Sequence, residues 1–345
     1  MNRATCILLP GLLAASLVAV EPAVGQDARF DARLDVNRVL LTARVLDRHN
    51  HPILGLGPAD FRVEVDGEAA TVESVEWVPG SAAYPGGLPP TEAAAAGVPP
   101  ALPGRLVVFF FQNDFGFSRA RLVGLMRMAP RARRFLDTLS ERDLVAILSF
   151  DSHLKLQVDF TADRTTLADA IEPRALLREP GRLEPGVHPS LATWFDHEAA
   201  LRAATPERAL LVTARALREL PGAKTLVLFG WGLGHFSASG VRMDRDYEPA
   251  RRELLAAGVT VFSMDVTDAD FHSLEVGLVQ VAEDTGGFYA KTHLFPDLAM
   301  ARLDEAMQGH YELVFERPEP RRGPGVLEVT LVGLRGTVLT RSALD

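Results

Sequence analysis

Residues 105–118 read RLVVFFFQNDFGFS, and this stretch decides the fold. Its apolar part, residues 106–111, is rich in β-branched and aromatic side chains and ends abruptly at Gln112. The run is shorter than an ordinary helix, and an unbroken apolar run of this kind is typical of a strand buried on both faces of a parallel sheet. Ser118, after a polar turn, is a favourable N-cap for a following helix. Because open α/β sheets bind ligands at the carboxyl ends of their strands, we expect a site at residues 113–118.

Further apolar runs follow the first one, and helical patterns separate them. The runs cover residues 144–150, 225–229 and 259–264, and residues 154–160 predict an edge strand beside the second strand. Alternation of strands and helices at this spacing predicts an α/β fold: a doubly wound, Rossmann-like, mostly parallel sheet that is flanked by helices.

The two ends of the chain have a different pattern. Residues 30–77 alternate between apolar and polar with period two and contain the hairpin signal Asp66-Gly67, which predicts a small N-terminal β module. A stretch rich in Pro, Gly and Ala follows and predicts a linker or a long surface loop. Strand-like segments also close the chain. The expected parts, in chain order, are a signal peptide over 1–25, the β module over 26–78, the linker over 79–104, the α/β domain over 105–310 and a C-terminal β extension over 311–345.

Residues 1–25 have the composition of a secretory signal peptide. Arg3 is positive, residues 7–20 are mostly apolar, and Ala23-Val24-Gly25 places small residues where a signal peptidase cleaves. Cys6, the only cysteine, lies ahead of that cleavage. We therefore expect an exported protein, periplasmic or extracellular, whose mature chain has no cysteine and no transmembrane anchor.

Composition and charge exclude some classes of function. The 345 residues are 47% hydrophobic and 23% charged, which is ordinary for a globular protein. The net charge of −9 and the isoelectric point near 5.5 argue against a nucleic-acid partner bound through its phosphates. The sequence has no phosphate-binding P-loop and no G-x-S-x-G elbow. No set of nucleophile and base is visible in it, so we do not expect an enzyme.

Several motifs, in order, resemble the bacterial secreted proteins with a von Willebrand factor A-like domain. The pattern D-F-x-V-x-x-D-G stands at residues 60–67, R-F-L-D-x-L at 134–139, D-x-V-A at 143–146, and A-x-x-T-G-G at 282–287. No single motif is decisive, but their order and spacing together cover most of the chain after residue 25. The resemblance implies a signal peptide, a short β module and an α/β domain.

The resemblance also implies a place for a divalent cation. Domains of this family commonly hold one through a D-x-S-x-S loop after the first strand, a Thr from a second loop and an Asp after the fourth strand. Here Asp114 and Ser118 align with the first loop, Gly116 replaces its middle Ser, and the run 225–229 is followed by Gly230 instead of an acidic residue. Thr193 is the only Thr in the region expected for the second loop. We therefore expect a degenerate site in which Asp114 and Ser118 cap the following helix.

Other candidates have weaker support from the sequence. His49 and His51 have the spacing of metal ligands but stand in a turn, and the charged residues 196–198 suit the first turn of a helix. Asp265, Asp268 and Asp270 form an acidic loop, which we interpret as a solvated surface.

Four aromatic residues are expected at the same edge of the sheet as the degenerate site. If they are exposed there, they mark a face that binds a partner, and the alternative is that they pack beneath the loops. They are Phe115, Phe117, Trp231 and Phe236.

The function favoured by the sequence is that of an exported, non-enzymatic binding protein. We expect it to recognise a protein or a cell-surface ligand through the loops at the carboxyl ends of the strands, without a cofactor. The alternative is a metal-dependent adhesion domain that uses Mg²⁺ or Mn²⁺ at Asp114 and Ser118. An exported hydrolase is the least supported possibility.

Overall fold

The computed structural model describes residues 38–80, 104–114, 118–181, 183–186, 189–238, 240–318 and 325–344, which belong to one compact unit, residues 37–345. Within these ranges, no helix has both the length and the apolar character that crossing a membrane requires. The predicted signal peptide and nearly all of the predicted linker, residues 81–103, lie outside the described residues.

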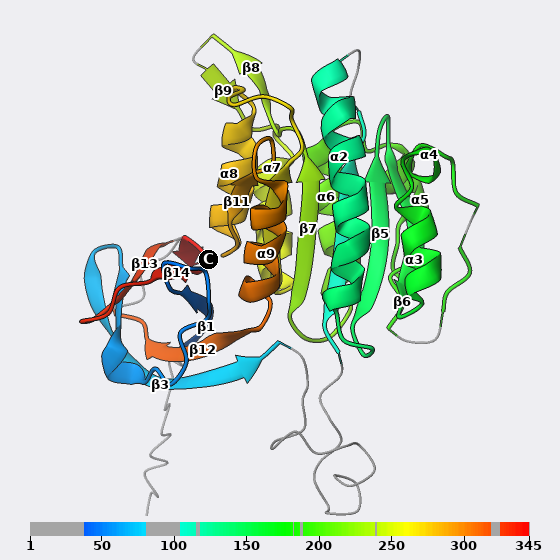
Figure 1. Cartoon of the computed structure of the whole chain (residues 1–345). Helices are drawn as coiled ribbons and strands as arrows, with labels where there is room; N and C mark the ends of the chain where they lie inside the picture. Colours follow the sequence, from blue (N-terminus) through cyan, green and yellow to red (C-terminus); the bar gives the residue numbers. More distant parts are fainter. Residues whose placement is uncertain are drawn as a thin grey trace, which may run out of the picture. The chain divides into compact units, whose positions relative to one another are not determined.

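The first sheet contains six strands in the order β11-β10-β7-β4-β5-β6 (Figure 1). Four of its neighbouring pairs are parallel, and β6 runs antiparallel to β5 at the edge. All seven residues of the central strand β4 are buried, as the apolar run at its position predicts. The bounds are β4 (Leu106–Gln112), β5 (Leu144–Phe150), β6 (Leu154–Thr161), β7 (Lys224–Gly230), β10 (Val259–Asp265) and β11 (Tyr289–Lys291).

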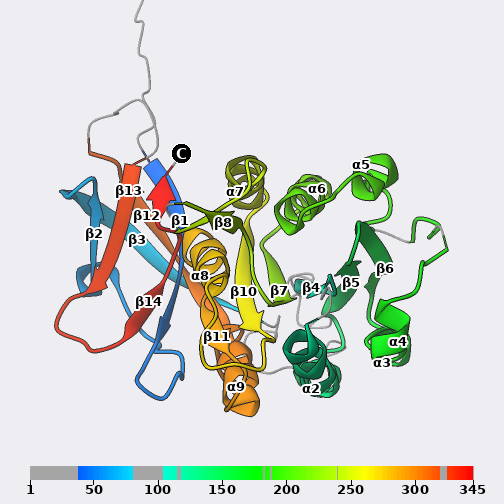
Figure 2. The ribbon, with the colours of Figure 1, turned by 90° about the horizontal axis from the view of Figure 1, so that it is seen from above.

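Helices cover both faces of this sheet (Figure 2). Successive side chains of β4 alternate between two apolar cores: Val108 packs with one set of helices and Phe109 with the other. One core includes residues of α5 (His197–Leu201), α6 (Pro206–Arg218), α7 (Tyr247–Ala256) and α8 (Glu275–Asp284). The other includes residues of α2 (Arg119–Phe135), η2 (Leu136–Thr138), α3 (Arg164–Ala170), α4 (Pro173–Leu176) and α9 (Pro296–Ala306).

The second sheet contains seven antiparallel strands in the order β14-β1-β12-β3-β2-β13-β15. Strands from both ends of the described chain therefore build one sheet around one core. The bounds are β1 (Arg38–Leu46), η1 (Pro58–Asp60), β2 (Phe61–Val65), β3 (Glu68–Pro79), β12 (Gly309–Glu316), β13 (Gly325–Leu331), β14 (Thr337–Leu339) and β15 (Ala343–Leu344). A separate hairpin is formed by β8 (His235–Ser237) and β9 (Gly240–Arg242).

The prediction of an α/β fold is confirmed. The mostly parallel arrangement applies to the six-stranded sheet, whereas the seven-stranded sheet is antiparallel. The predicted hairpin joins β2 to β3, and both residues of its turn have positive φ, Asp66 at 54° and Gly67 at 81°. Such a pair is typical of the tight turns that match the twist of a hairpin.

Candidate functional site

Asp114 and Trp231 meet where β4 and β7 end. The indole Nε1 of Trp231 donates a hydrogen bond of 2.8 Å to Asp114 Oδ1. Gln112, the last residue of β4, accepts hydrogen bonds from the backbone N–H groups of Trp231 at 3.0 Å and Gly232 at 3.3 Å. The guanidinium of Arg121 stacks on the indole, 3.2 Å from the ring centroid. An indole and a guanidinium therefore surround the carboxylate that was aligned with a metal ligand.

Burial changes the acidity of this carboxylate. It raises the pKa of Asp114 from 3.8 to about 6, and the hydrogen bond from Trp231 and the charge of Arg121 offset only part of that rise. The carboxyl group of Asp114 therefore changes between its protonated and its charged form close to neutral pH.

The predicted helix caps are wrong in detail. Ser118 is the N-cap residue of α2, but its side chain makes no capping hydrogen bond. Asp114 does not cap the helix either, since its carboxylate accepts the indole N–H of Trp231. Thr193 is not joined to them: its backbone N–H donates to Ser190, which is itself bound to Asp159 of β6.

The structure separates the two predicted aromatic residues that it describes. Trp231 is half-buried and packs against the core beneath α2 and α9. Phe236 lies on β8 with 68% of its surface exposed. The ring contacts of the described residues do not include a pair between them. Phe115 and Phe117 lie outside the described residues.

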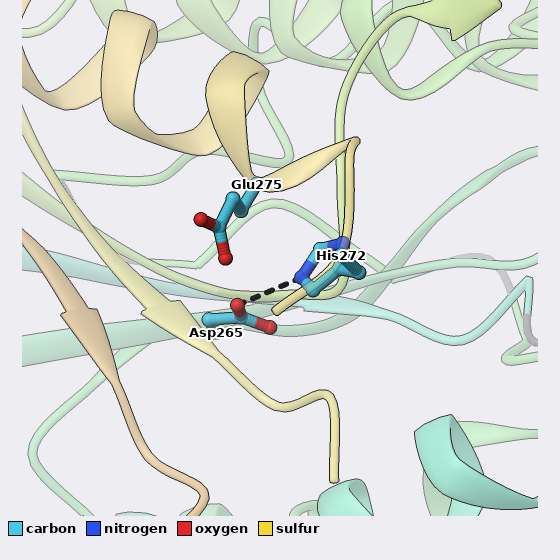
Figure 3. Close-up of side chains that lie close together, drawn as sticks. All are labelled: Asp265, His272 and Glu275. Atoms are coloured by element: carbon cyan, nitrogen blue, oxygen red, sulfur yellow. Dashed lines mark hydrogen bonds and ion pairs between the residues drawn. The ribbon is translucent and has the colours of Figure 1, made fainter. Parts of the chain in front are cut away.

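A second polar cluster lies two strands along the same edge, at the end of β10 (Figure 3). Asp265, His272 and Glu275 place one ligand atom each within 4.8 Å of one another. His272 Nε2 is 2.8 Å from Asp265 Oδ2, and Asp265 is only 2% exposed. One imidazole and two carboxylates are a ligand set that suits Zn²⁺ or Mn²⁺.

Protein groups already bind each member of this cluster. The hydroxyl of Tyr289 donates to Asp265 Oδ2 at 2.7 Å, and the backbone N–H of Thr267 donates to Asp265 Oδ1 at 2.9 Å. Lys291 Nζ lies 3.1 Å from Glu275. Burial, and then the charge of Asp265, raises the pKa of Tyr289, so that its hydroxyl stays protonated and donates. The cluster is thus a satisfied hydrogen-bonded network, and a cation would have to displace the ammonium of Lys291 from Glu275.

The interpretation of the acidic loop as a solvated surface is wrong for Asp265, whereas Asp268 is partly exposed and ion-paired. Asp265 is buried in the network above. Asp268 is bound by Arg127 of α2 and by His293, whose Nδ1 lies 2.8 Å away. Sequence reasoning missed these partners because they come from segments far along the chain. Asp270 alone is largely exposed.

Exposed apolar side chains surround this end of the sheet. The loop after β10, the loop after β11 and the first turn of α9 carry them, and the bond between Asp268 and His293 joins the two loops. We name this set the apolar rim. Its members are 63% to 69% exposed: Phe271, Leu294, Phe295 and Leu298. Sequence reasoning missed them because an exposed apolar residue in a loop has no periodic signal.

A serine and a histidine also lie together at the end of β5. Ser152 Oγ is 3.0 Å from His153 Nδ1, and His153 Nε2 is 3.2 Å from Glu179. The order matches a nucleophile, a base and an orienting acid. However, the hydroxyl of Ser152 also bonds Asp151, and Lys155 pairs with both Asp151 and Glu179. This group stabilises the turn between β5 and β6.

His49 and His51, the two histidines with the spacing of metal ligands, do not lie near this edge of the sheet. Asp47 accepts hydrogen bonds from the backbone N–H groups of His49 and His51, so the three form a turn after β1. Asp196 caps α5 by accepting from Ala199 N, as expected for charge in a first turn.

Comparisons with known proteins find similarity to solved structures at low sequence identity. No protein-family model and no curated protein matches the chain. Similar solved structures include a von Willebrand factor type A protein from Catenulispora acidiphila, with 12% identity and a TM-score of 0.41 over 83% of this chain and 74% of that one. They also include three domains of the type V pili tip protein Mfa5 from Porphyromonas gingivalis, with 12% identity and a TM-score of 0.40 over 76% and 54%.

A mutant of the PilB minor pilin from Streptococcus sanguinis is similar at 14% identity and a TM-score of 0.38 over 59% of this chain. This chain spans 61% of that pilin's length. Likeness at this level carries no argument about function, which has to come from the site.

Proposed function

We propose that this protein is an exported, non-enzymatic interaction protein that binds a protein or cell-surface partner at the carboxyl edge of its six-stranded sheet. The observation that carries the proposal is the state of Asp114. Its carboxylate accepts a hydrogen bond from Trp231, and the positive charge of Arg121 lies close to it, which supports binding without a cation.

The chemistry of this loop opposes a hard divalent cation. Mg²⁺ and Mn²⁺ favour several oxygen ligands, and the strand that should supply a second carboxylate continues into Gly230 and Trp231. Arg121 already provides positive charge near Asp114, and a cation there would meet repulsion from it.

The apolar rim supplies a surface for the partner. Three of its large side chains lie on two loops and Leu298 lies in the first turn of α9, and Arg127 and Arg131 of α2 bind Asp268 and Asp297 in these segments. A group of exposed apolar side chains on anchored loops is typical of a protein-binding surface. Export rests on the composition of residues 1–25.

The test is site-specific photo-crosslinking of the full chain in an exporting bacterial host. A photoreactive phenylalanine analogue replaces Leu298 in the apolar rim, or Leu54, which is 63% exposed in the turn between β1 and β2, as the matched control. We expect a discrete crosslinked product from position 298 alone, with the same yield in Mg²⁺ and in EDTA. Equal products from both positions would contradict the rim as the binding surface. A product that EDTA abolishes would favour a metal-dependent adhesion domain.

A further inference from the structure

A cavity of about 790 Å³ opens at the amino edge of the six-stranded sheet, opposite the candidate site. Leu106, Leu144 and Lys224, the first residues of β4, β5 and β7, line one side of it. Arg44 of β1 and His310 of β12 line another side. The cavity therefore lies among described residues that the proposed function does not use. Its size is within the range of roughly 300–1,000 Å³ that is usual for small-molecule sites.

Two buried cations face this cavity. Lys224 is 4% exposed, and its Nζ donates to the backbone carbonyl of Ala257 at 2.9 Å and to that of Leu220. Arg44 is 6% exposed, and its guanidinium donates to Ala306 O at 3.1 Å and to Thr260 Oγ1 at 3.2 Å. Neither of them forms an ion pair with a carboxylate of the residues that the structure describes.

These cations are held at an energetic cost. Burial lowers the pKa of Lys224 from 10.5 to about 8 and that of Arg44 from 12.5 to about 10, and no negative side chain offsets either shift. A buried charge is normally paired, because desolvation disfavours it. Carbonyl groups at the ends of α6, α7 and α9 accept from these two side chains, and Arg44 also lies over the Phe262 ring, 5.5 Å from its centroid.

The other titratable groups of the lining are Arg105, Glu219, His310 and Glu312. Arg105 is paired with Asp143. Burial lowers the pKa of His310 to about 4, so its ring is neutral at pH 7. Glu312, 3.8 Å from the neutral His310, and Glu219, 3.9 Å from Arg218, add negative charge to the lining, but both carboxylates are substantially exposed. Solvent therefore screens them more than it screens the two buried cations.

We propose that this cavity binds a long-chain monocarboxylate, with its carboxylate at Lys224 and Arg44 and its hydrocarbon chain along the apolar lining. The ammonium group of a lysine has three N–H donors. Backbone carbonyls of the described residues accept from two of the donors of Lys224, which leaves one donor for the ligand. Leu106, Leu144, Pro221 and Met307 supply apolar wall. A single negative charge fits better than the double charge of a phosphate monoester, because backbone carbonyl oxygens crowd both cations.

The experiment compares hexadecanoate with its methyl ester on the wild-type full chain by isothermal titration calorimetry. We expect the acid to bind with an affinity at least about tenfold higher than that of the ester, because only the acid neutralises the buried cations. Equal affinities, or no binding of the acid, would overturn the proposal. This comparison requires no variant and no assumption about a variant's folding.

Two variants then assign the head-group contact. Lys224→Met should reduce the affinity for the acid about tenfold and leave that for the ester unchanged, which removes the preference. Lys291→Met is the matched control: this lysine is half-exposed at the opposite edge and pairs with Glu275, so the preference should remain. An acid preference that survives Lys224→Met would contradict the assignment, and Arg44→Met provides a second test at the other cation.

Discussion

At the scale of single residues, the bond between Trp231 and Asp114 changes what a metal-site motif can do. Sequence could place Asp114 at the end of a buried strand, because the apolar run ends there. It could place Trp231 at the same edge of the sheet but could not find the hydrogen bond, because Trp231 lies 117 residues away and follows a strand three strands later. Tertiary partners of this kind have no local pattern. The same holds for Arg44 and for Lys224, which precedes the apolar run at 225–229: local pattern does not place them against one cavity.

Asp114→Asn should stabilise the protein increasingly as the pH rises. Below about pH 3.8 the carboxyl group is protonated in both states, whereas between about 3.8 and 6 the folded state binds a proton that the unfolded state has released. The stability that the protonated Asp114 side chain contributes to the wild type is therefore lost as the pH rises through 6. The neutral amide of the variant does not titrate and has no such loss. The variant's advantage in free energy of unfolding should grow between pH 4 and pH 7.5 to at most about 3 kcal/mol. Urea denaturation at several pH values measures it, and an advantage that shrinks with pH would show that something stabilises the charged carboxylate.

At the scale of elements, the strands could be predicted well and the helix contacts poorly. The apolar runs match β4, β5, β7 and β10 because strands buried on both faces have an unbroken pattern. Pro130 predicts a kink or break, yet α2 continues through it as one helix. The residues on both sides of this proline, including Met128 and Phe135, are buried, and their packing outweighs the lost hydrogen bond. The close approach of α2 to the loop after β10 is likewise absent from the sequence.

Gly124→Ala should destabilise the protein, although alanine favours helices in general. A Cβ at position 124 would lie 1.4 Å from the backbone oxygen of Val266, so the helix or the loop would have to move. We expect a loss of about 2 kcal/mol in the free energy of unfolding, the range of overpacked cores. The control is Gly181→Ala, where nothing lies within 4 Å of the new Cβ and stability should hold within about 0.5 kcal/mol. Chemical denaturation measures the free energy of unfolding of both variants. Equal stability of the two would show that α2 does not approach the loop so closely.

At the scale of the whole molecule, the second sheet joins segments that the sequence presents as unrelated. β1, β2 and β3 come from before the α/β region, and β12 to β15 come after it. Each segment shows a period-two pattern, but pattern alone does not say which strands pair. The core around Tyr311 needs both segments, with Phe61 and Trp77 packed edge-on against its ring.

Val329→Asp should unfold this sheet or destabilise it severely. Val329 is 9% exposed in β13, and its register partner is Val63 of β2. A carboxylate there has no cationic partner in the described core, and the expected loss is about 3 kcal/mol or more. Val326→Asp on the same strand is the control, because that side chain is 68% exposed. Tryptophan fluorescence during denaturation of a variant that keeps Trp77 but has Trp194 and Trp231 replaced by Phe would follow the sheet. Equal effects of the two substitutions would show that β13 is not packed as described.

The most direct test of whether Asp114 binds a cation is thermal unfolding of the wild-type protein and of Asp114→Ala at increasing concentrations of Mg²⁺ or Mn²⁺. We expect millimolar Mg²⁺ or Mn²⁺ to leave the unfolding midpoint of both proteins unchanged, because Trp231 and Arg121 already surround the carboxylate. A bound cation at about 100 times its dissociation constant would stabilise the wild type by roughly 2.7 kcal/mol, which is readily visible. A saturable rise in the midpoint that Asp114→Ala abolishes would contradict the account and establish a working metal site in this loop.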